Sequence, residues 1–270
     1  MLFSTAALSI TFPMIDPVLV EIGPLAIRWY ALSYVAGILL GWWYIGKLDK
    51  KTQIFVQKAY DDFIIWAIFG ILLGGRLGYV LFYNLPYYSS NPSEILAVWK
   101  GGMSFHGGLI GVIISIYLMC RTYKMSFLKT TDLICCAAPI GIFFGRIANF
   151  VNAELYGRIT DVSWGVVFPG EVFARHPSQL YEALLEGLVL FLIMFFLVTK
   201  THSRERAGFL SGFFLVGYSF FRASVELFRE PDPQLGFIFS DITMGQMLSI
   251  PMFLIGVVLM ARAARKENVS

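Results

Sequence analysis

The sequence predicts an all-α integral membrane protein with seven transmembrane helices, an N-terminus outside and a cytoplasmic C-terminus. First, 57% of the 270 residues are hydrophobic and only 14% are charged, whereas soluble domains carry roughly 25% charge. Second, apolar runs near the ~20 residues that cross a bilayer core recur along the whole chain. Third, lysine and arginine alternate between the connections. We therefore expect a single polytopic membrane domain over residues 1–270.

Seven apolar segments are expected to span the membrane, each as a helix, because lipid leaves the backbone groups of an open strand unpaired. They cover residues 23–46, 62–84, 104–120, 131–150, 179–199, 208–228 and 239–261. The start of the chain lacks the charged region of a cleaved signal peptide, so the first segment is the expected insertion signal. The third and fourth segments are the least regular, because glycines crowd one while Pro139 and Gly141 interrupt the other.

The connections between these segments predict the orientation. The first, third and fifth connections and the C-terminal tail hold 13 lysines and arginines, and the even connections hold four. By the positive-inside rule, the odd connections and the C-terminus are cytoplasmic. This placement gives no support to nucleic-acid binding. The three cysteines lie in or at the end of apolar runs, and the sequence has no HExxH or Cys/His cluster, so no metal site is expected.

Four arginines lie within or at the end of apolar segments, where an ionised side chain costs at least ~2.5 to 3.5 kcal/mol. They are Arg28, Arg76, Arg146 and Arg222. With the orientation above, all four fall towards the outer ends of their helices. Arg28 is interpreted as an interfacial anchor whose side chain reaches the headgroups. For Arg76, support of a site and helix packing both remain open.

Arg146 and Arg222 have polar neighbours that point to an inward-facing site. These neighbours are Asn149, Asn152 and Glu154 after Arg146, and Tyr218 and Glu226 on either side of Arg222. Tyr218, Arg222 and Glu226 are spaced four apart and share one helix face. Since arginine forks bind phosphate through paired charge-assisted hydrogen bonds, the pattern predicts an anion site facing lipid headgroups.

Two further polar clusters are expected on the same side. His106 lies between glycine pairs at the outer start of the third segment, where glycines allow a ligand to approach the backbone. The outer start of the fifth segment carries His176, Ser178, Gln179, Tyr181 and Glu182. His202 lies in a cytoplasmic connection and is interpreted as a solvated loop residue.

Other classes of membrane protein fit some of these features. A transporter or channel for an anionic solute also uses intramembrane arginines, but it is expected to place polar groups near the midplane and often to show a repeat. A scaffold with structural arginines predicts that Arg146→Ala harms folding alone. A different lipid transferase is the nearest enzymatic alternative. Polar groups in the outer half and the lack of a repeat favour an enzyme over a transporter.

Several long motifs resemble those of the prolipoprotein diacylglyceryl transferases of bacterial inner membranes. They are RWYALSY, GGMSFHGGLIG, GRIANFVNAELYGR, HPSQLYE and YSFFRASVELFREPD, and the likeness runs from about Asp16 to Pro251. The resemblance implies transfer of a diacylglyceryl group from phosphatidylglycerol to the lipobox cysteine of a prolipoprotein, with release of glycerol 1-phosphate. It implies membrane lipids, phosphatidylglycerol and the prolipoprotein signal peptide as partners, and no cofactor.

The resemblance also assigns roles. Catalytic roles are expected for Arg146, Arg222, His106, Tyr30 and Tyr218. Phosphatidylglycerol binding is expected for Arg146, Asn149, Glu154, Gly157, Arg222 and Glu226. Supporting roles are expected for Arg76, His176, Gln179, Tyr181 and Asn152.

The chemistry of the side chains suggests roles for the arginine guanidinium groups and for His106. Guanidinium charge favours the thiolate form of the substrate cysteine, whose free thiol has a pKa of ~8.5. Of the groups that can accept the thiol proton, His106 is preferred over a tyrosine. The chain departs from the family pattern at Ala148 and Ala153, where glycine is common, and in a short outer connection from about residue 158 to 175. The short connection leaves open how the substrate peptide is clamped.

Overall fold

The computed structural model describes residues 10–23, 25–231, 237–239 and 242–267. The chain forms two compact units: the first contains Met1–Ile45 and Asp132–Ser270, and the second contains Gly46–Thr131. The single domain predicted for the whole chain stays a prediction.

The helices and strands have these bounds. Helices are α1 Trp29–Thr52, α2 Gln57–Tyr83, α3 Leu85–Ser90, α4 Phe105–Thr122, α5 Phe127–Val151, α6 Ser178–Glu182, α7 Leu190–Lys200, α8 Phe209–Val225 and α9 Met244–Glu267. A π-helical segment, Ala183–Val189, joins α6 to α7, and 3₁₀ turns cover Pro92–Glu94, Val98–Lys100 and Ser203–Glu205. Strands are β1 Ile10–Thr11, β2 Val18–Ile22, β3 Leu25–Arg28, β4 Val166–Val167, β5 Phe237–Phe239 and β6 Ile242–Thr243.

Most of the predicted spans correspond to helices long enough for a bilayer. Among the described residues, six helical stretches are long and apolar enough to cross a membrane: Trp29–Thr52, Gln57–Tyr83, Phe105–Thr122, Phe127–Val151, Ser178–Lys200 and Met244–Arg265. The all-α membrane fold is thus confirmed. The remaining predicted span, 208–228, appears as α8, an apolar helix of 17 residues, which is short against the ~20 that a span requires. The count of seven therefore stays a prediction.

The predicted start of the first span at residue 23 is wrong. The stretch up to Arg28 belongs to a hairpin in which β2 pairs antiparallel with β3, with Val18 opposite Arg28. Gly23 has a φ of +59°, a left-handed conformation that favours glycine and fits a turn between strands. The Gly-Pro dipeptide at this point is a turn signal. Arg28 is exposed at the end of β3, directly before α1.

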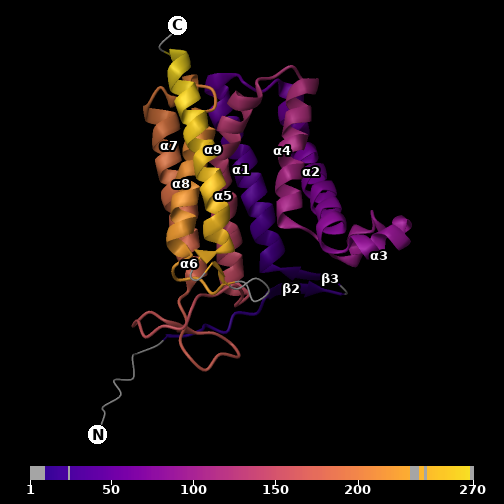
Figure 1. Cartoon of the computed structure of the whole chain (residues 1–270), viewed down its shortest axis with the longest axis vertical. Coiled ribbons are helices and arrows are strands. Elements are labelled where there is room, and N and C mark those ends of the chain that lie inside the picture. Colours follow the sequence, from indigo (N-terminus) through magenta and orange to yellow (C-terminus); the bar gives the residue numbers. More distant parts are fainter. Residues whose placement is uncertain (1–9, 24, 232–236, 240–241, 268–270) are drawn as a thin grey trace. The chain divides into compact units, whose positions relative to one another are not determined.

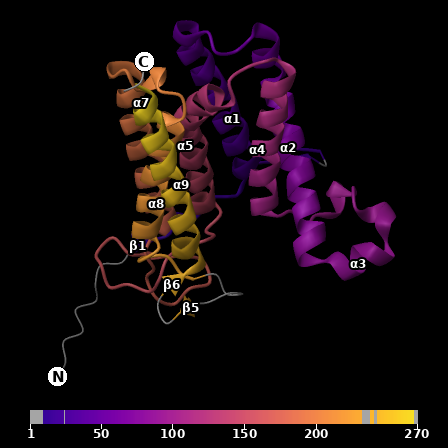
Figure 2. The same cartoon turned by 45° about the horizontal axis from the view of Figure 1, so that its top comes forward.

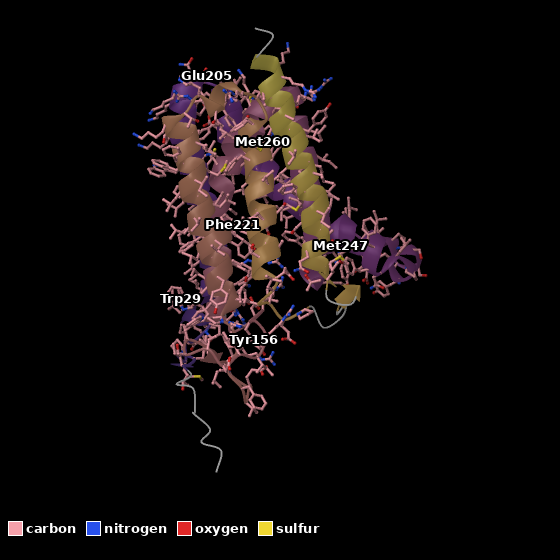
Figure 3. All side chains as sticks on the ribbon, turned by 60° about the vertical axis from the view of Figure 1, so that its left-hand side comes forward. Trp29, Tyr156, Glu205, Phe221, Met247 and Met260 are labelled. Atoms are coloured by element: carbon pink, nitrogen blue, oxygen red, sulfur yellow. The ribbon has the colours of Figure 1, made fainter. Side chains whose placement is uncertain are left out.

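In the first unit, α5, α7, α8 and α9 run side by side (Figure 1). Glycines permit two of the close contacts. A Cβ added to Gly212 of α8 would lie 2.6 Å from the Gly256 carbonyl oxygen of α9, and one added to Gly187 would lie 2.8 Å from Phe143 Cβ of α5. Tyr156 lies at one end of this unit and Glu205 at the other (Figure 3). The helix ends near Tyr156 carry the candidate site.

A loop region covers that end of the first unit. β1 pairs parallel with β4, which joins the start of the chain to the connection between α5 and α6. Phe12, Val166 and Phe168 form a small buried core there, against which Phe150 and Tyr156 pack. This packing orders the backbone that follows α5.

In the second unit, α2 and α4 lie side by side, with α3 near one end of α2 (Figure 2). Glycines face one another along this pair: Gly70, Gly74 and Gly78 on α2, and Gly107 and Gly111 on α4. A Cβ on any of them would meet backbone of the partner helix within 3 Å, which is how small residues let membrane helices approach closely. The glycines after His106 therefore serve helix packing, although we expected them to admit a ligand.

Candidate functional site

Charged side chains gather inside one end of the first unit. Arg146 comes from the last turns of α5, Glu182 from the end of α6, Glu186 from the π-helical segment and Arg222 from the last turn of α8. Their burial is extreme for charged residues, because Glu182 is 1% exposed, Glu186 0% and Arg222 9%. Buried ionic groups persist only when they are paired, so these residues must be held by one another.

The ion pairs join four segments of the chain. Arg146 Nε lies 2.5 Å from Glu182 Oε2, and Arg222 Nη1 lies 3.4 Å from Glu182 Oε1. Arg222 Nη2 pairs directly with Glu226 Oε1, four residues further along the same helix face. Arg229 Nη1 lies 3.2 Å from Glu226 Oε1, which adds a third arginine to the cluster.

The segment before α9 completes one side of the cluster. The hydroxyl of Thr243, in β6, donates to Glu226 Oε2 at 2.6 Å, and Thr243 is 2% exposed. Glu226 therefore receives Arg222, Arg229 and a hydroxyl at once. This arrangement fixes the carboxylate and, through it, the guanidinium of Arg222.

Several polar atoms of the cluster still lack a hydrogen bond. Among the described residues, Arg222 Nη1 and both side-chain oxygens of Glu182 and Glu186 are buried and have no hydrogen-bond partner, so their contacts are ionic. Buried polar atoms are normally hydrogen-bonded. The cluster thus retains the capacity to bind a further polar group, and guanidinium donors suit a phosphate.

A second chain of contacts leads from Arg146 towards the loop region. Arg146 Nη1 donates to Asn149 Oδ1 at 3.5 Å, and Asn149 Nδ2 donates to Glu154 Oε1 at 2.7 Å. Gln179 Nε2, at the start of α6, donates to the Glu154 carbonyl oxygen at 2.7 Å. The structure therefore brings together Arg146, Asn149 and Glu154, which come from one predicted polar motif, with Gln179, which comes from another.

Two predicted tyrosines border the cluster. The Tyr30 hydroxyl lies 3.0 Å from that of Tyr34 and interacts electrostatically with Glu154 and Arg146. Tyr218 interacts electrostatically with Glu186 and Arg222, among others. Both phenols therefore lie close enough to the arginines to interact with them electrostatically.

Gly157 joins the loop region to the segment after α8. Its amide donates to the His176 carbonyl oxygen at 2.8 Å, and it forms a β-bridge with Arg229. A side chain at this position would collide with the Phe228 carbonyl oxygen and the His176 backbone. Next to it, Arg158 Nε donates to the Arg229 carbonyl oxygen at 2.9 Å. This contact surface fixes the backbone that carries Arg229.

His176 and Tyr181 belong to an aromatic group beside that surface. His176 Nδ1 lies 3.1 Å from the Tyr181 hydroxyl, which accepts a hydrogen bond from Trp164 Nε1 at 2.8 Å. The His176 and Phe228 rings are 5.1 Å apart. Burial lowers the pKa of His176 below its ordinary value. Asn152 lies in the turn after α5, where its amide donates to the Ala148 carbonyl oxygen.

His106 and Arg76 lie in the second compact unit. Arg76 is 0% exposed and donates to the carbonyl oxygens of Glu94 at 2.8 Å, Ile95 at 2.7 Å and Gly101. Arg76, on α2, therefore holds the backbone of the connection between α2 and α4 in place. His106 is exposed in the first turn of α4, with its ring 5.6 Å from that of Phe105.

A family model described as prolipoprotein diacylglyceryl transferase matches residues 17–262. The chain belongs to this family. The phosphatidylglycerol–prolipoprotein diacylglyceryl transferase of Azospirillum brasilense is 57% identical over 263 residues, which cover 96% of this chain and 98% of the relative. That of Rickettsia bellii is 55% identical over 255 residues, which cover 93% and 97%. That of Paramagnetospirillum magneticum is 54% identical over 261 residues, which cover 96% and 97%.

Sequence reasoning missed part of this transferase-family site. Glu186 and Arg229 were not predicted, and Glu182 was noticed only as part of a polar cluster. The available signal was the pair Glu182 and Glu186, four residues apart within an apolar run. The cost of placing a charge in the bilayer applies to glutamate as it does to arginine. No group of three or more potential metal ligands occurs in the described ranges.

Proposed function

We propose that the chain transfers the diacylglyceryl group of phosphatidylglycerol to the thiol of the lipobox cysteine of a prolipoprotein. The reaction forms a thioether, releases glycerol 1-phosphate and is the first step of bacterial lipoprotein maturation. The names of relatives that are 54% to 57% identical over nearly the whole chain support this reaction. The structural observation that carries it is the buried cluster in which Arg146, Arg222 and Arg229 converge on three glutamates.

The proposed reaction begins with the phosphate of the lipid bound by Arg146 and Arg222. The substrate sulfur attacks C3 of the glycerol that carries the acyl chains, and the bond between C3 and the phosphate oxygen breaks. Guanidinium groups stabilise the negative charge that develops on the departing phosphate. They also favour the thiolate of the incoming cysteine. The remaining predicted residues, Tyr30, Asn149, Glu154, Gly157, Tyr218 and Glu226, orient these arginines or border the lipid headgroup.

We assign His106 as the proton acceptor from the thiol. It is exposed at the start of α4, and the unprotonated nitrogen of a neutral imidazole can accept a proton. His106→Gln is expected to lower turnover throughout a profile from pH 6 to 8, because the glutamine amide cannot accept the thiol proton. Near-normal turnover of this variant across that range would rule out an obligatory role as base.

The topology belongs to the same proposal. We place the chain in the bacterial inner membrane with seven spans, of which α8 is the shortest, and with the arginine cluster towards the periplasm. Lys200, Arg204 and Arg206 lie at the other end of the first unit's helices, as the positive-inside rule requires of a cytoplasmic face. Cysteine labelling from the periplasm tests this orientation. The cysteine of a Glu171→Cys variant is expected to react with a membrane-impermeant reagent, and that of a Glu205→Cys variant is expected to stay unlabelled.

The function is tested directly with purified protein in detergent. The protein is incubated with phosphatidylglycerol and a peptide that carries a lipobox cysteine, and glycerol phosphate release and peptide mass are measured. The expected result is a peptide mass gain of one diacylglyceryl group with matching release. A peptide in which serine replaces the cysteine is the matched control. A folded preparation that gives neither signal would refute the proposal.

A further inference from the structure

Glu182 lies where three guanidinium groups meet. Its side-chain oxygens are 2.5 Å from Arg146 Nε, 3.4 Å from Arg222 Nη1 and 3.8 Å from Arg229 Nε. These arginines come from α5, α8 and the segment that follows α8. A carboxylate that is 1% exposed and contacts all three fixes their mutual distances.

Glu186 offers a comparison inside the same cluster. It is 0% exposed, yet its oxygens lie 3.9 Å from Arg146 Nη2 and 3.7 Å from Arg222 Nη1. Charge-assisted contacts that define direction are ~2.7 to 2.9 Å long. Glu186 therefore contributes negative charge from a greater distance, while Glu182 lies in close ionic contact with Arg146 and limits where its guanidinium can lie.

The local backbone explains why Glu182 reaches Arg146. Residues Ala183–Val189 form a π-helix, in which the Leu190 amide bonds to the Leu185 carbonyl oxygen, five residues back. At Gly187 the backbone approaches α5 so closely that an added Cβ would lie 2.8 Å from Phe143 Cβ. Arg146 follows Phe143 by about one helical turn, so this close approach sets Arg146 against the carboxylates. π-Helical turns are frequent at functional sites.

Arg146 depends on Glu182 more than Arg222 does. Its hydrogen bond to Asn149 is long, at 3.5 Å, and Glu186 is farther still. Arg222 keeps a direct ion pair with Glu226, which Thr243 holds in place. Removing the charge of Glu182 would thus release Arg146 first.

We propose that Glu182 is a positioning residue that aims the guanidinium of Arg146 at the lipid phosphate, whereas Glu186 tunes only the charge of the cluster. The proposal rests on the proposed transferase function and deepens it. Its consequence is a split between two kinetic parameters: kcat depends on orientation, and KM for an anionic lipid depends on charge.

The test compares Glu182→Gln with Glu186→Gln, which makes the same change at a similarly buried glutamate four residues further along the chain. For Glu182→Gln, kcat is expected to fall about thirtyfold or more, because a misplacement of about 1 Å near the reacting atoms can lower a rate on the order of a hundredfold. Its KM for phosphatidylglycerol is expected to stay equal or fall, because the cluster gains net positive charge. For Glu186→Gln, kcat is expected to fall less, by about threefold, because its contacts with both arginines are longer. Equal losses of kcat, or a Glu182→Gln defect confined to KM, would overturn the proposal.

A second measurement does not require turnover. Phenylglyoxal modifies guanidinium groups, and mass spectrometry of the digested protein gives the rate at each arginine. Arg146 is expected to react faster in Glu182→Gln than in the wild type or Glu186→Gln, with Arg222 changing less. An unchanged Arg146 rate would refute the positioning role, whereas a wild type that modifies normally but transfers nothing would refute the proposed function instead.

If Glu182→Gln fails to fold in detergent, Glu182→Asp carries the test. This variant keeps the charge but shortens the side chain by one methylene, so the 2.5 Å contact with Arg146 Nε cannot persist unchanged. Faster modification of Arg146 and a kcat about tenfold lower are expected. Wild-type values for both would contradict the proposal.

Discussion

Replacing Gly157 by alanine is expected to damage both the stability and the activity of the protein. The added Cβ would meet the Phe228 carbonyl oxygen, and it would lie 2.8 Å from His176 Cβ and 2.9 Å from the His176 carbonyl oxygen. Two of these neighbours are backbone atoms, so the backbone at Gly157, His176 or Phe228 has to move. Overpacking of this kind typically costs about 1–3 kcal/mol.

The displacement would reach the arginine cluster. Phe228 precedes Arg229, whose guanidinium lies 3.2 Å from Glu226. A shift of about 1 Å at a catalytic constellation can lower the rate about a hundredfold. We therefore expect Gly157→Ala to lower the free energy of unfolding by about 1–3 kcal/mol and kcat/KM by about tenfold or more.

The assays are denaturant unfolding in detergent and glycerol phosphate release. Gly145→Ala is the matched control for stability, because an added Cβ there has no neighbour within 4 Å. In a helix interior that change is expected to stabilise slightly, by up to about 1 kcal/mol. A Gly157→Ala protein with wild-type stability and wild-type kcat/KM would show that the backbone around Gly157 accommodates a methyl group, which would refute the reasoning from close packing.

Three more changes follow from the contacts described. Arg222→Lys is expected to lower kcat/KM about a hundredfold in the glycerol phosphate release assay. The reason is that one ammonium group cannot contact Glu182 and Glu226 at once. Near-normal activity of this variant would contradict the prediction. Ala153→Gly is expected to raise the free energy of unfolding by about 1 kcal/mol. Ala153 has a φ of +53°, a conformation that costs a residue with a side chain ~1–2 kcal/mol. An unchanged free energy of unfolding in denaturant would contradict this prediction. His176 has a lowered pKa, so the unfolded chain binds more protons and stability is expected to fall as pH drops below about 6.5. His176→Gln should flatten that part of an unfolding profile, and an identical slope would exclude His176 as the cause.

The general fold could be predicted because composition and insertion cost act on the whole chain. Apolar runs located six long helices to within a few residues at most ends. The start of α1 was predicted too early because the hairpin before it is also apolar. A short apolar run does not distinguish a strand from a helix. Its turn signal, Gly23 followed by proline, was present in the sequence.

The sequence pointed to the arginines of the site because a buried cation is costly. It did not point to the glutamates that pair with them, because no carboxylate partners were looked for in the apolar runs. Arg146 and Arg222 were found from the price of burying a cation, and the same argument applied to Glu182 and Glu186 would have found their partners. Arg229 gave no such signal, because it follows the apolar run and looks like a loop residue. Arg76 was detected as unusual, but its four carbonyl partners lie 18 to 26 residues away and follow from no periodicity.

The ion pair between Arg146 and Glu182 also constrains how the protein is made. The two residues are 36 positions apart in the chain, so at synthesis rates of ~5–20 residues per second Arg146 waits roughly 2–7 s for its partner. During that interval a cation enters the membrane uncompensated. Its place in the last turns of α5 lets the side chain reach the headgroups meanwhile. Biogenesis therefore favours a site near a helix end, where the nascent chain tolerates each arginine until the carboxylates arrive.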